Sequence, residues 1–490
     1  MSITTAVVFV FVVYILITLV IGYIGWKKTK LTPEDYFLAG RSLGPFVLSL
    51  TLIATYASMW TFLGAVGANY RTGPSFMSSM ITWNLIWPLM IWVFGVRLWL
   101  LGRKFGYITP SDMFADYYGS EAIRVVASVV GIIALIPYMS IQLLGGGLAF
   151  EAATNGAIPF WAGALIMVIV IALYTFFGGL RAVAWTDVFQ GLFFLVVLLV
   201  LSIWSIQLTG ANPFRTLAEN HPEIFDPGRF KWGLWFGFIM TWGLAPILPH
   251  MLQRSFMAKS ARSITQSAVT VAILSPWFQT VTVMIIGVSA LVLLPGLKGG
   301  ATDAIIPALL AKYAPYVGAI VTSAAFAAGM STLDSQLLSA SSLITRDIWV
   351  KYIDKTADHK KQTWIGKLFV LFVTIVMYLF VLTKPGLIVV LGTAGAGICI
   401  AGYVFPVIGV LFWPRVGRAA ALWSLIVGGV VAFLTFAVWN FPLGIHNTLW
   451  GIAAGLVTFL VLTYATKPVP YDVQARFHGY LVSYTHGEKG

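Results

Sequence analysis

The sequence predicts an all-α polytopic membrane protein with about 13 transmembrane helices. Of its 490 residues, 59% are hydrophobic and only 10% are charged, whereas soluble proteins carry roughly 25% charged residues. The apolar residues form continuous blocks of about 20, the length that a helix needs to cross ~30 Å of hydrocarbon. A β-barrel would show alternating segments of about ten residues instead. A water-soluble fold of this size is therefore excluded.

Thirteen candidate spans follow from these apolar blocks and from the Gly, Pro and charged residues that separate them. They cover approximately residues 3–26, 44–68, 77–101, 123–149, 158–179, 184–208, 232–253, 266–294, 316–345, 366–383, 387–413, 419–440 and 446–466. We do not interpret the first span as a cleavable signal, because no positive charge precedes its long apolar run.

The basic residues predict the orientation. If the N-terminus is outside, 23 of the 30 Lys and Arg residues, Arg254 among them, fall in cytoplasmic segments. This asymmetry predicts an N-terminus outside and a cytoplasmic C-terminus in a multi-pass protein of the plasma (inner) membrane. It also accounts for the net charge of +13, so we expect the lipid bilayer as the environment and no nucleic acid as a partner.

The chain has no motif of an ATP-driven pump or of a soluble enzyme. It contains no P-loop, no HExxH and no Cys/His metal spacing, and the run 145–147 of three glycines lies in an apolar span, where close helix packing is the ordinary use. The single cysteine, Cys399, reads as a small buried hydrophobic residue. We therefore expect no enzymatic activity and no disulfide.

One predicted helix face carries oxygen ligands through the membrane. Asp187 and Asp334 are the two carboxylates well inside the spans, and at about 100° per residue Asp334 shares a face with Ser331, Thr332 and Ser335. Hydroxyl and carboxylate oxygens suit a hard cation such as Na⁺. A Ser-rich face for tight packing is the alternative.

Two side chains near the cytoplasmic interface have open interpretations. Asp187 either belongs to a site within the membrane or faces the interface and pairs with Arg181. His250 is either a proton-transferring group or an interface residue. The residue types alone leave both alternatives open.

Two spans are expected to be unusual. The seventh contains Pro246 and Pro249, which remove backbone donors and favour interruption, and interrupted spans are where secondary transporters bind solute and ions. The second is crowded with small and hydroxyl residues over 51–67. The seventh span is the fifth span after the second, so the two spans enter the membrane from opposite sides, as a five-plus-five inverted repeat requires.

The chain resembles the sodium:solute symporter family over nearly its whole length. The resemblance rests on four segments: Gly40–Phe46 (GRSLGPF), Gly178–Asp187, Pro249-His250 followed by Gln253-Arg254, and Met330–Ser342 ending in Thr345-Arg346-Asp347. The stretch 51–67 most resembles the pantothenate and monocarboxylate branch. The resemblance implies Na⁺-coupled uptake by alternating access and an inverted-repeat core with interrupted helices.

The same resemblance divides the chain into three parts. Residues 1–43 would form an extra N-terminal helix and a cytoplasmic loop, and residues 44–413 the inverted-repeat core. Residues 414–490 would form two further helices and a short cytoplasmic tail.

The family's sites transfer to this chain residue by residue. The sodium site maps onto the carbonyl groups of Ala54, Ala57 and Ala328 and the hydroxyls of Ser331 and Thr332, which implies unwinding near Ala54–Ala57 although no proline forces it. A second cation or proton site maps onto Asp187, Asp334 and Ser335, together with Ser331. The candidate solute ligands are Tyr56, Ser58, Trp60, Thr61, Gln142 and Trp242.

We predict a sodium-coupled symporter of a small organic acid, with Na⁺ as coupling ion and no other cofactor. We expect no Lys or Arg in mid-membrane, so a carboxylate would be met by backbone N–H groups, hydroxyls and the Na⁺ itself. Proline, amino-acid or sugar symport, with sodium or proton coupling, is the alternative. A channel or a transporter-like sensor is a more distant one, and the oligomeric state is open.

Overall fold

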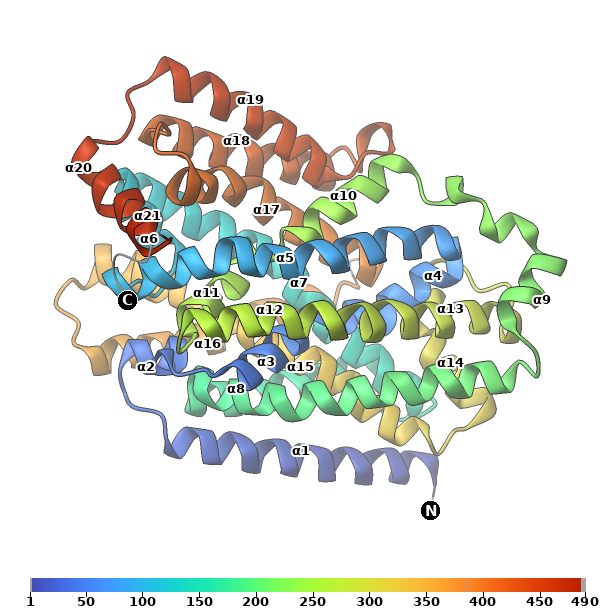
Figure 1. Cartoon of the computed structure of the whole chain (residues 1–490). Helices are drawn as coiled ribbons and strands as arrows, with labels where there is room; N and C mark the ends of the chain where they lie inside the picture. Colours follow the sequence, from blue (N-terminus) through green and yellow to red (C-terminus); the bar gives the residue numbers. More distant parts are fainter. Residues whose placement is uncertain (1, 385, 486–490) are drawn as a thin grey trace.

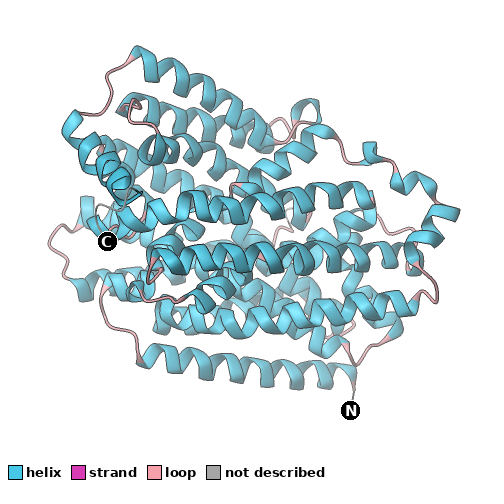
Figure 2. Cartoon of the chain, in the orientation of Figure 1, coloured by secondary structure: helices cyan, strands magenta, loops and turns pink. Residues whose placement is uncertain are grey.

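The computed structural model describes residues 2–384 and 386–485, which are almost entirely helical and contain no β-strand (Figure 2). The helices of the first half are α1 (Ile3–Lys27), α2 (Pro33–Leu38), α3 (Pro45–Tyr56), α4 (Val66–Thr72), α5 (Pro74–Phe105), α6 (Pro110–Tyr118), α7 (Glu121–Ala153), α8 (Phe160–Leu208) and α9 (Pro213–Asn220). Those of the second half are α10 (Trp232–Gly243), α11 (Pro249–Met257), α12 (Ala261–Pro276), α13 (Thr282–Leu293), α14 (Ile305–Tyr313), α15 (Gly318–Ser342), α16 (His359–Val381), α17 (Ile388–Phe412), α18 (Arg418–Ala437), α19 (Asn447–Ala465), α20 (Tyr471–Gln474) and α21 (Tyr480–Thr485). Figure 1 shows the long helices running side by side.

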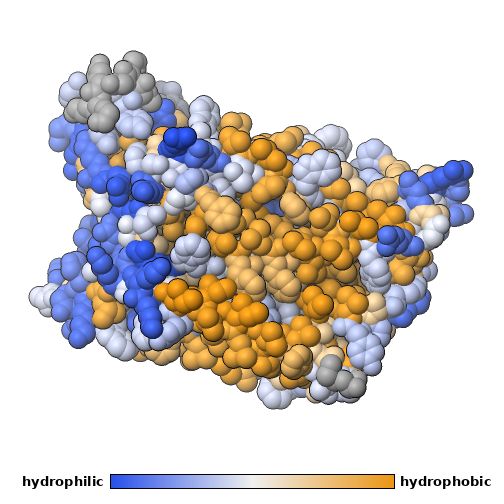
Figure 3. All heavy atoms as spheres, turned by 60° about the horizontal axis from the view of Figure 1, so that its bottom comes forward, coloured by the Kyte–Doolittle hydropathy of each residue, from blue (hydrophilic) through white to orange (hydrophobic). Residues whose placement is uncertain are grey.

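On the face shown in Figure 3, an apolar belt lies between two hydrophilic ends of the molecule. Among the described residues, nine helices are long and apolar enough to cross a membrane, or ten if the bent pair of residues 45–56 and 60–72 is one span. The polytopic α-helical prediction is confirmed, but the total of thirteen is not. Three predicted spans account for the difference. Helix α15, which is rich in hydroxyl groups, and the α10–α11 pair are absent from this count, and α8, which corresponds to two predicted spans, counts once.

Helix α8 contains two antiparallel halves. Gly179 has φ +56° and ψ −162°, a conformation that glycine adopts without a Cβ penalty. An added Cβ there would lie 2.5 Å from the Tyr36 ring. Tyr174 and Thr186, on either side of this reversal, both flank Gly22 of α1. The predicted spans 158–179 and 184–208 therefore correspond to the two halves of one element.

Both predicted interruptions are present, and the interrupted spans run in opposite directions. The chain bends by 56° between α3 and the helical turn Trp60–Ala65 that leads into α4. A short turn, Ala245–Ile247, separates α10 from α11. Leu43, just before α3, forms a backbone bridge with Ala258, just after α11. The start of one span therefore meets the end of the other.

The segment after α19 packs against α5 and α6, at the end that is predicted to face the cytoplasm. Phe477 is fully buried and stacks on Phe105 with ring centroids 4.7 Å apart. Arg476 pairs with Asp116 at 2.6 Å, and Tyr117 Oη lies 2.9 Å from His478 Nε2. The described part of the predicted tail, residues 467–485, thus covers one end of the bundle.

The centre of the bundle contains α17, the most buried of the candidate spans. Its Cys399 is 1% exposed, as predicted for a small hydrophobic residue. It forms no disulfide, being the one cysteine of the chain.

Candidate functional site

The end of α3 meets the middle of α15 through two hydroxyl groups. Ser331 Oγ donates to the Ala54 carbonyl at 3.0 Å, and Thr332 Oγ1 donates to the Thr55 carbonyl at 3.0 Å. Both hydroxyls also lie 3.2–3.3 Å from the Ala328 carbonyl. Because the last carbonyls of a helix lack intrahelical partners, the oxygens of Ala54 and Thr55 are available to α15. Four of the five predicted sodium-site residues therefore meet here.

Ala57, the fifth predicted residue, lies at the interruption itself. It is the first residue after α3 and has an extended backbone with φ −83° and ψ 106°. Its N–H still donates to the Ile53 carbonyl at 2.8 Å. Helical hydrogen bonding thus reaches Ala57, but helical backbone geometry ends at Tyr56.

Side chains hold this interruption open. Ser58 Oγ accepts from the Trp60 N–H at 3.1 Å, and Gln142 Oε1 from α7 accepts from the Met59 N–H at 3.0 Å. Gln142 also donates to the Tyr138 carbonyl at 3.3 Å. Buried backbone N–H groups need partners, and here polar side chains replace the missing helical carbonyls. This is the physical reason that a break forms without a proline.

A buried guanidinium lies beside Asp187. Arg254 of α11 is 1% exposed, and its Nη2 lies 3.4 Å from Asp187 Oδ2 and 2.6 Å from Ser335 Oγ. The same nitrogen contacts the hydroxyls of Thr51 and Thr55 on α3. Thr51 also donates to Asp187. One positive charge therefore joins α3, α8, α11 and α15.

Asp334 belongs to the same network through Ser335. Tyr174 Oη donates to Asp334 Oδ2 at 2.6 Å, and Ser335 Oγ lies 3.1 Å from Asp334 Oδ1. Arg181 pairs with Asp35 at 2.5 Å rather than with Asp187. The alternative that Asp187 faces the interface and pairs with Arg181 is therefore not what the structure shows.

Sequence reasoning assigned Arg254 to the cytoplasmic surface and expected no basic side chain within the membrane core. That expectation does not hold, because Arg254 is buried against Asp187. A usable signal was present: a carboxylate inside a span requires a partner, and Arg254 follows the interrupted seventh span directly. Two of the positions predicted for a second cation or proton, Asp187 and Ser335, already contact this guanidinium.

His250 is buried one turn before Arg254. Its carbonyl accepts from Arg254 Nη1 at 2.8 Å, and its ring lies 5.9 Å from that of Tyr138. It is not a surface residue, and its Nδ1 has no partner among the described residues.

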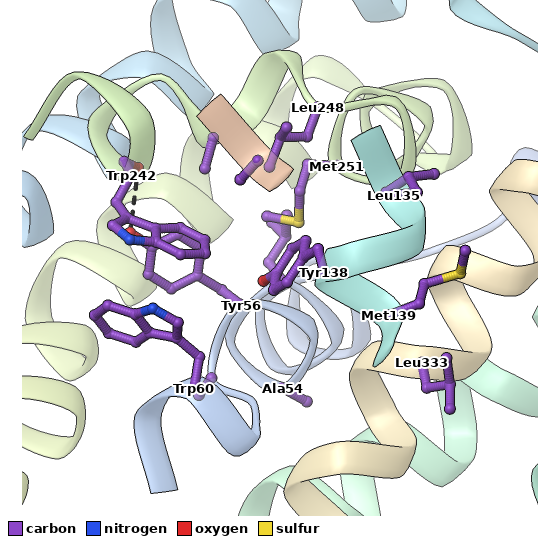
Figure 4. Close-up of a cluster of buried hydrophobic side chains, with 14 of the residues drawn as sticks. Ala54, Tyr56, Trp60, Leu135, Tyr138, Met139, Trp242, Leu248, Met251 and Leu333 are labelled. Atoms are coloured by element: carbon purple, nitrogen blue, oxygen red, sulfur yellow. Dashed lines mark hydrogen bonds between the residues drawn. The ribbon is translucent and has the colours of Figure 1, made fainter. Parts of the chain in front are cut away.

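The aromatic solute candidates gather between the two interruptions (Figure 4). Tyr56 Oη donates to the Trp242 carbonyl at 3.2 Å, which joins the end of α3 to the end of α10. The indole N–H groups of Trp60 and Trp242 both donate to Thr393 Oγ1, at 2.9 and 3.2 Å. Sequence reasoning missed Thr393, a hydroxyl within the small-residue run of α17.

The remaining candidates differ in their positions. Ser58 and Gln142 support the interruption, and Thr61 is buried in the helical turn that follows it. Two unpredicted aromatic residues complete the group: Trp87 stacks on Tyr56 with centroids 4.1 Å apart, and Tyr138 lies 5.5 Å from Trp242.

A carboxylate outside the spans connects helices near the aromatic group. Asp303, in the loop before α14, accepts from the Ile388 N–H at 2.8 Å and lies 3.9 Å from Arg71. Burial raises the pKa of Asp303 to about 6, although the Ile388 N–H and Arg71 favour its charged form. Asp303 thereby links the starts of two helical segments, α14 and α17, to α4.

Comparison with known proteins identifies the family. Residues 36–428 match the sodium:solute symporter family. The chain belongs to this family. The resemblance inferred from the motifs is therefore confirmed.

Two relatives match nearly end to end. The sodium/pantothenate symporter of Escherichia coli (strain K12) is 29% identical over 459 residues, covering 89% of this chain and 91% of the relative. The sodium/proline symporter 2 of Staphylococcus saprophyticus is 30% identical over 481 residues, covering 93% and 92%.

Solved structures share the fold. A Na⁺-coupled sialic acid symporter in a substrate-bound outward-open state has a TM-score of 0.79 at 20% identity, covering 96% of this chain and 99% of that chain. Mhp1, a nucleobase-cation-symport-1 family transporter, has a TM-score of 0.57 at 15% identity, covering 91% and 98%. These likenesses confirm the predicted transporter fold class.

Proposed function

We propose that this chain is a sodium-coupled symporter that imports a small organic acid by alternating access. The observation that carries the proposal is the meeting of Ser331 and Thr332 with the free carbonyl groups at the end of α3. This contact brings oxygen atoms from two distant segments together next to an interrupted helix. Interrupted helices are the usual ion and solute positions in secondary transporters.

The proposed sodium ligands are the carbonyls of Ala54, Ala57 and Ala328 and the hydroxyls of Ser331 and Thr332. Each hydroxyl now donates its proton to a carbonyl. Rotation of the two O–H bonds would turn hydroxyl and carbonyl lone pairs toward one cation, which is the ligand chemistry that a hard cation prefers. Sodium would then strengthen the contact between α3 and α15.

Coupling follows from the shared segment. The helix that supplies Ala54 to the sodium site also ends in Tyr56, which bonds the Trp242 carbonyl in the solute region. If sodium fixes this end of α3, it favours the solute-binding arrangement, and each ligand raises the affinity for the other by the same factor. A membrane potential of ~100 mV contributes about 2.3 kcal/mol per charge moved.

In this proposal the bound Na⁺ is one positive charge, and Arg254 supplies the second. Asp187, Asp334 and Ser335 were predicted to bind a second cation or a proton, and the guanidinium contacts Asp187 and Ser335 directly. A fixed cation there compensates a buried carboxylate without an additional ion. Proton coupling through Asp334 and Asp187 is the rival arrangement.

The proposed solute is a monocarboxylate-like or pantothenate-like acid. It is supported by the near end-to-end match to a sodium/pantothenate symporter. A sodium/proline symporter of similar identity makes an amino acid the second candidate. The solute ligands would be Tyr56, Ser58, Trp60, Thr61, Gln142 and Trp242.

We further propose a plasma-membrane location with the N-terminus outside and the C-terminus cytoplasmic. Within this arrangement, residues 1–43, 44–413 and 414–490 keep the roles of extra helix, inverted-repeat core and C-terminal helix pair. The basic end of the molecule that contains the α20–α21 segment would then be cytoplasmic.

Reconstitution in liposomes tests the function. Radiolabelled lactate, pyruvate, pantothenate, proline and glucose are compared under an inward sodium gradient, with choline replacing sodium at fixed pH as the control. We expect saturable, sodium-dependent uptake of an acid. Uptake that persists in choline would contradict sodium coupling, and uptake of proline or glucose alone would contradict the organic acid.

A further inference from the structure

A separate cavity of about 300 Å³ lies where α4, α10 and α17 meet. Its floor includes Phe76 and Phe238, whose rings contact each other at 5.7 Å and lie 6.3 and 6.4 Å from the ring of Trp60. Trp60 is one of the proposed solute ligands. The cavity is therefore separated from the proposed solute region by a single layer of aromatic side chains.

The cavity wall contains a buried hydrogen-bond donor without a partner. His446 is 1% exposed, and its ring lies 5.2 Å from Phe238 and 5.3 Å from Phe441, which also line the cavity. The Thr448 N–H donates to His446 Nδ1 at 3.3 Å, so Nδ1 carries no proton. A neutral imidazole then carries its proton on Nε2. That Nε2 has no hydrogen-bond partner among the described residues.

Basic side chains surround the same cavity. Arg229 and Lys231 line it and are exposed, and neither forms an ion pair within the described part of the chain. Arg71 also lines it, but Asp303 and Thr302 already contact this guanidinium. Two exposed positive charges thus border an otherwise apolar space, and the buried His446 forms part of its wall.

This combination has a defined chemical complement. A carboxylate can accept from an imidazole N–H and is attracted by uncompensated Arg and Lys side chains. Aromatic walls favour an apolar tail on the same molecule. An inorganic anion would use the charges but would leave the aromatic surface in contact with water.

We propose that this cavity is a second binding station, which captures a small organic carboxylate with an apolar tail before it passes the aromatic layer. His446 Nε2–H donates to the carboxylate, Arg229 and Lys231 attract it, and Phe76 and Phe238 contact the tail. The inference rests on the proposed function, because it names the same class of solute at an earlier position. Binding at this station requires no sodium.

Saturation-transfer NMR on the purified full-length protein tests this station. The probe is phenylacetate in sodium-free choline methanesulfonate, and uncharged phenylacetamide is its control. We expect phenylacetate to give a signal and phenylacetamide little or none. We expect Arg229→Gln and Lys231→Gln each to weaken binding about two- to fivefold, and His446→Phe, which keeps an aromatic ring, about fivefold or more.

Two further variants separate this inference from the proposed function. Lys298→Gln, at an exposed lysine outside the cavity, should leave the signal unchanged. Ser331→Ala should keep the sodium-free signal while needing roughly tenfold more sodium for half-maximal uptake. Equal signals from acid and amide, or an acid signal that survives the triple variant R229Q/K231Q/H446F, would overturn the station and leave sodium-coupled uptake as a separate result. Because H446F could perturb folding, its melting temperature is compared with that of R229Q/K231Q, which changes only exposed residues.

Discussion

At the scale of single residues, the contact between α3 and α15 is made by atoms that a helix leaves without partners. Ala54 and Thr55 are among the last residues of α3, so their carbonyls lack intrahelical donors. Ser331 and Thr332 supply those donors from another helix. The two hydroxyls therefore join α3 to α15 by hydrogen bonding and are also the groups that would bind an ion.

Ser331→Ala or Thr332→Ala should raise the sodium concentration for half-maximal uptake roughly tenfold, because each variant removes a ligand to a charged group. Uptake measured against sodium concentration in liposomes provides the test. Ser339→Ala is the matched control, since Ser339 is also buried on α15 and its hydroxyl has no partner among the described residues. Unchanged sodium dependence in both variants would remove this site.

The Arg254–Asp187 pair provides the second residue-scale prediction. Arg254→Gln or Asp187→Asn alone should lower stability by about 3–5 kcal/mol, because each leaves an uncompensated buried charge. The double variant should lose less than the sum of the two. Thermal unfolding in detergent measures this coupling.

Sodium should stabilise Arg254→Gln more than it stabilises the wild type, because Na⁺ can then occupy the place of the guanidinium. Melting temperatures in sodium and choline salts give this comparison. Strict additivity of the two single variants, or equal sodium responses, would argue against a resident cation at Asp187.

At the scale of elements, the interrupted second span depends on a neighbouring helix as well as on its own Ser58. Pro246 and Pro249 made the interruption of the seventh span predictable. No such residue precedes the break after Tyr56, where Gln142 of α7 accepts the freed Met59 N–H. A partner from another helix has no local sequence signal, and the resemblance alone indicated unwinding there.

Gln142→Leu should therefore destabilise the break specifically. It leaves the Met59 N–H buried without an acceptor, at a cost of about 1–3 kcal/mol. We expect a lower melting temperature together with weaker solute affinity. Gln279→Leu, at another buried glutamine, is the control: if it weakened solute affinity equally, the effect would not belong to the break.

At the scale of the whole molecule, distant segments are joined by a few buried polar groups. Asp303 links a loop to the start of α17 and to Arg71 of α4. Arg254 likewise joins four helices. The helical architecture, the apolar belt and the interruption of the seventh span were predictable from hydropathy and proline positions. These long-range polar partners were not, because hydropathy places a residue along the membrane normal but does not identify its neighbour.

The buried Asp303 predicts a pH dependence of stability. Its pKa is raised to about 6 in the folded protein, above the unfolded value of about 3.9, so folding favours the protonated form. The wild type should lose about 2 kcal/mol relative to Asp303→Asn as pH rises from 4 to 7. Melting temperatures of the two proteins across this range measure the effect.

The exposed-site variant Glu219→Gln controls for general charge effects in that experiment, since the Glu219 side chain is 60% exposed. A constant difference between wild type and Asp303→Asn across the pH range would show that Asp303 does not titrate as proposed.

The buried position of Cys399 has a practical consequence for following the transport cycle. The chain has no other sulfhydryl, and this one is sealed inside α17. Maleimide or nitroxide reagents added to the folded carrier would therefore react with engineered thiols and find little background. Spectroscopic rulers attached at exposed positions next to α11 and α15 could then report how far these helices separate as salt is exchanged, without first replacing the native cysteine.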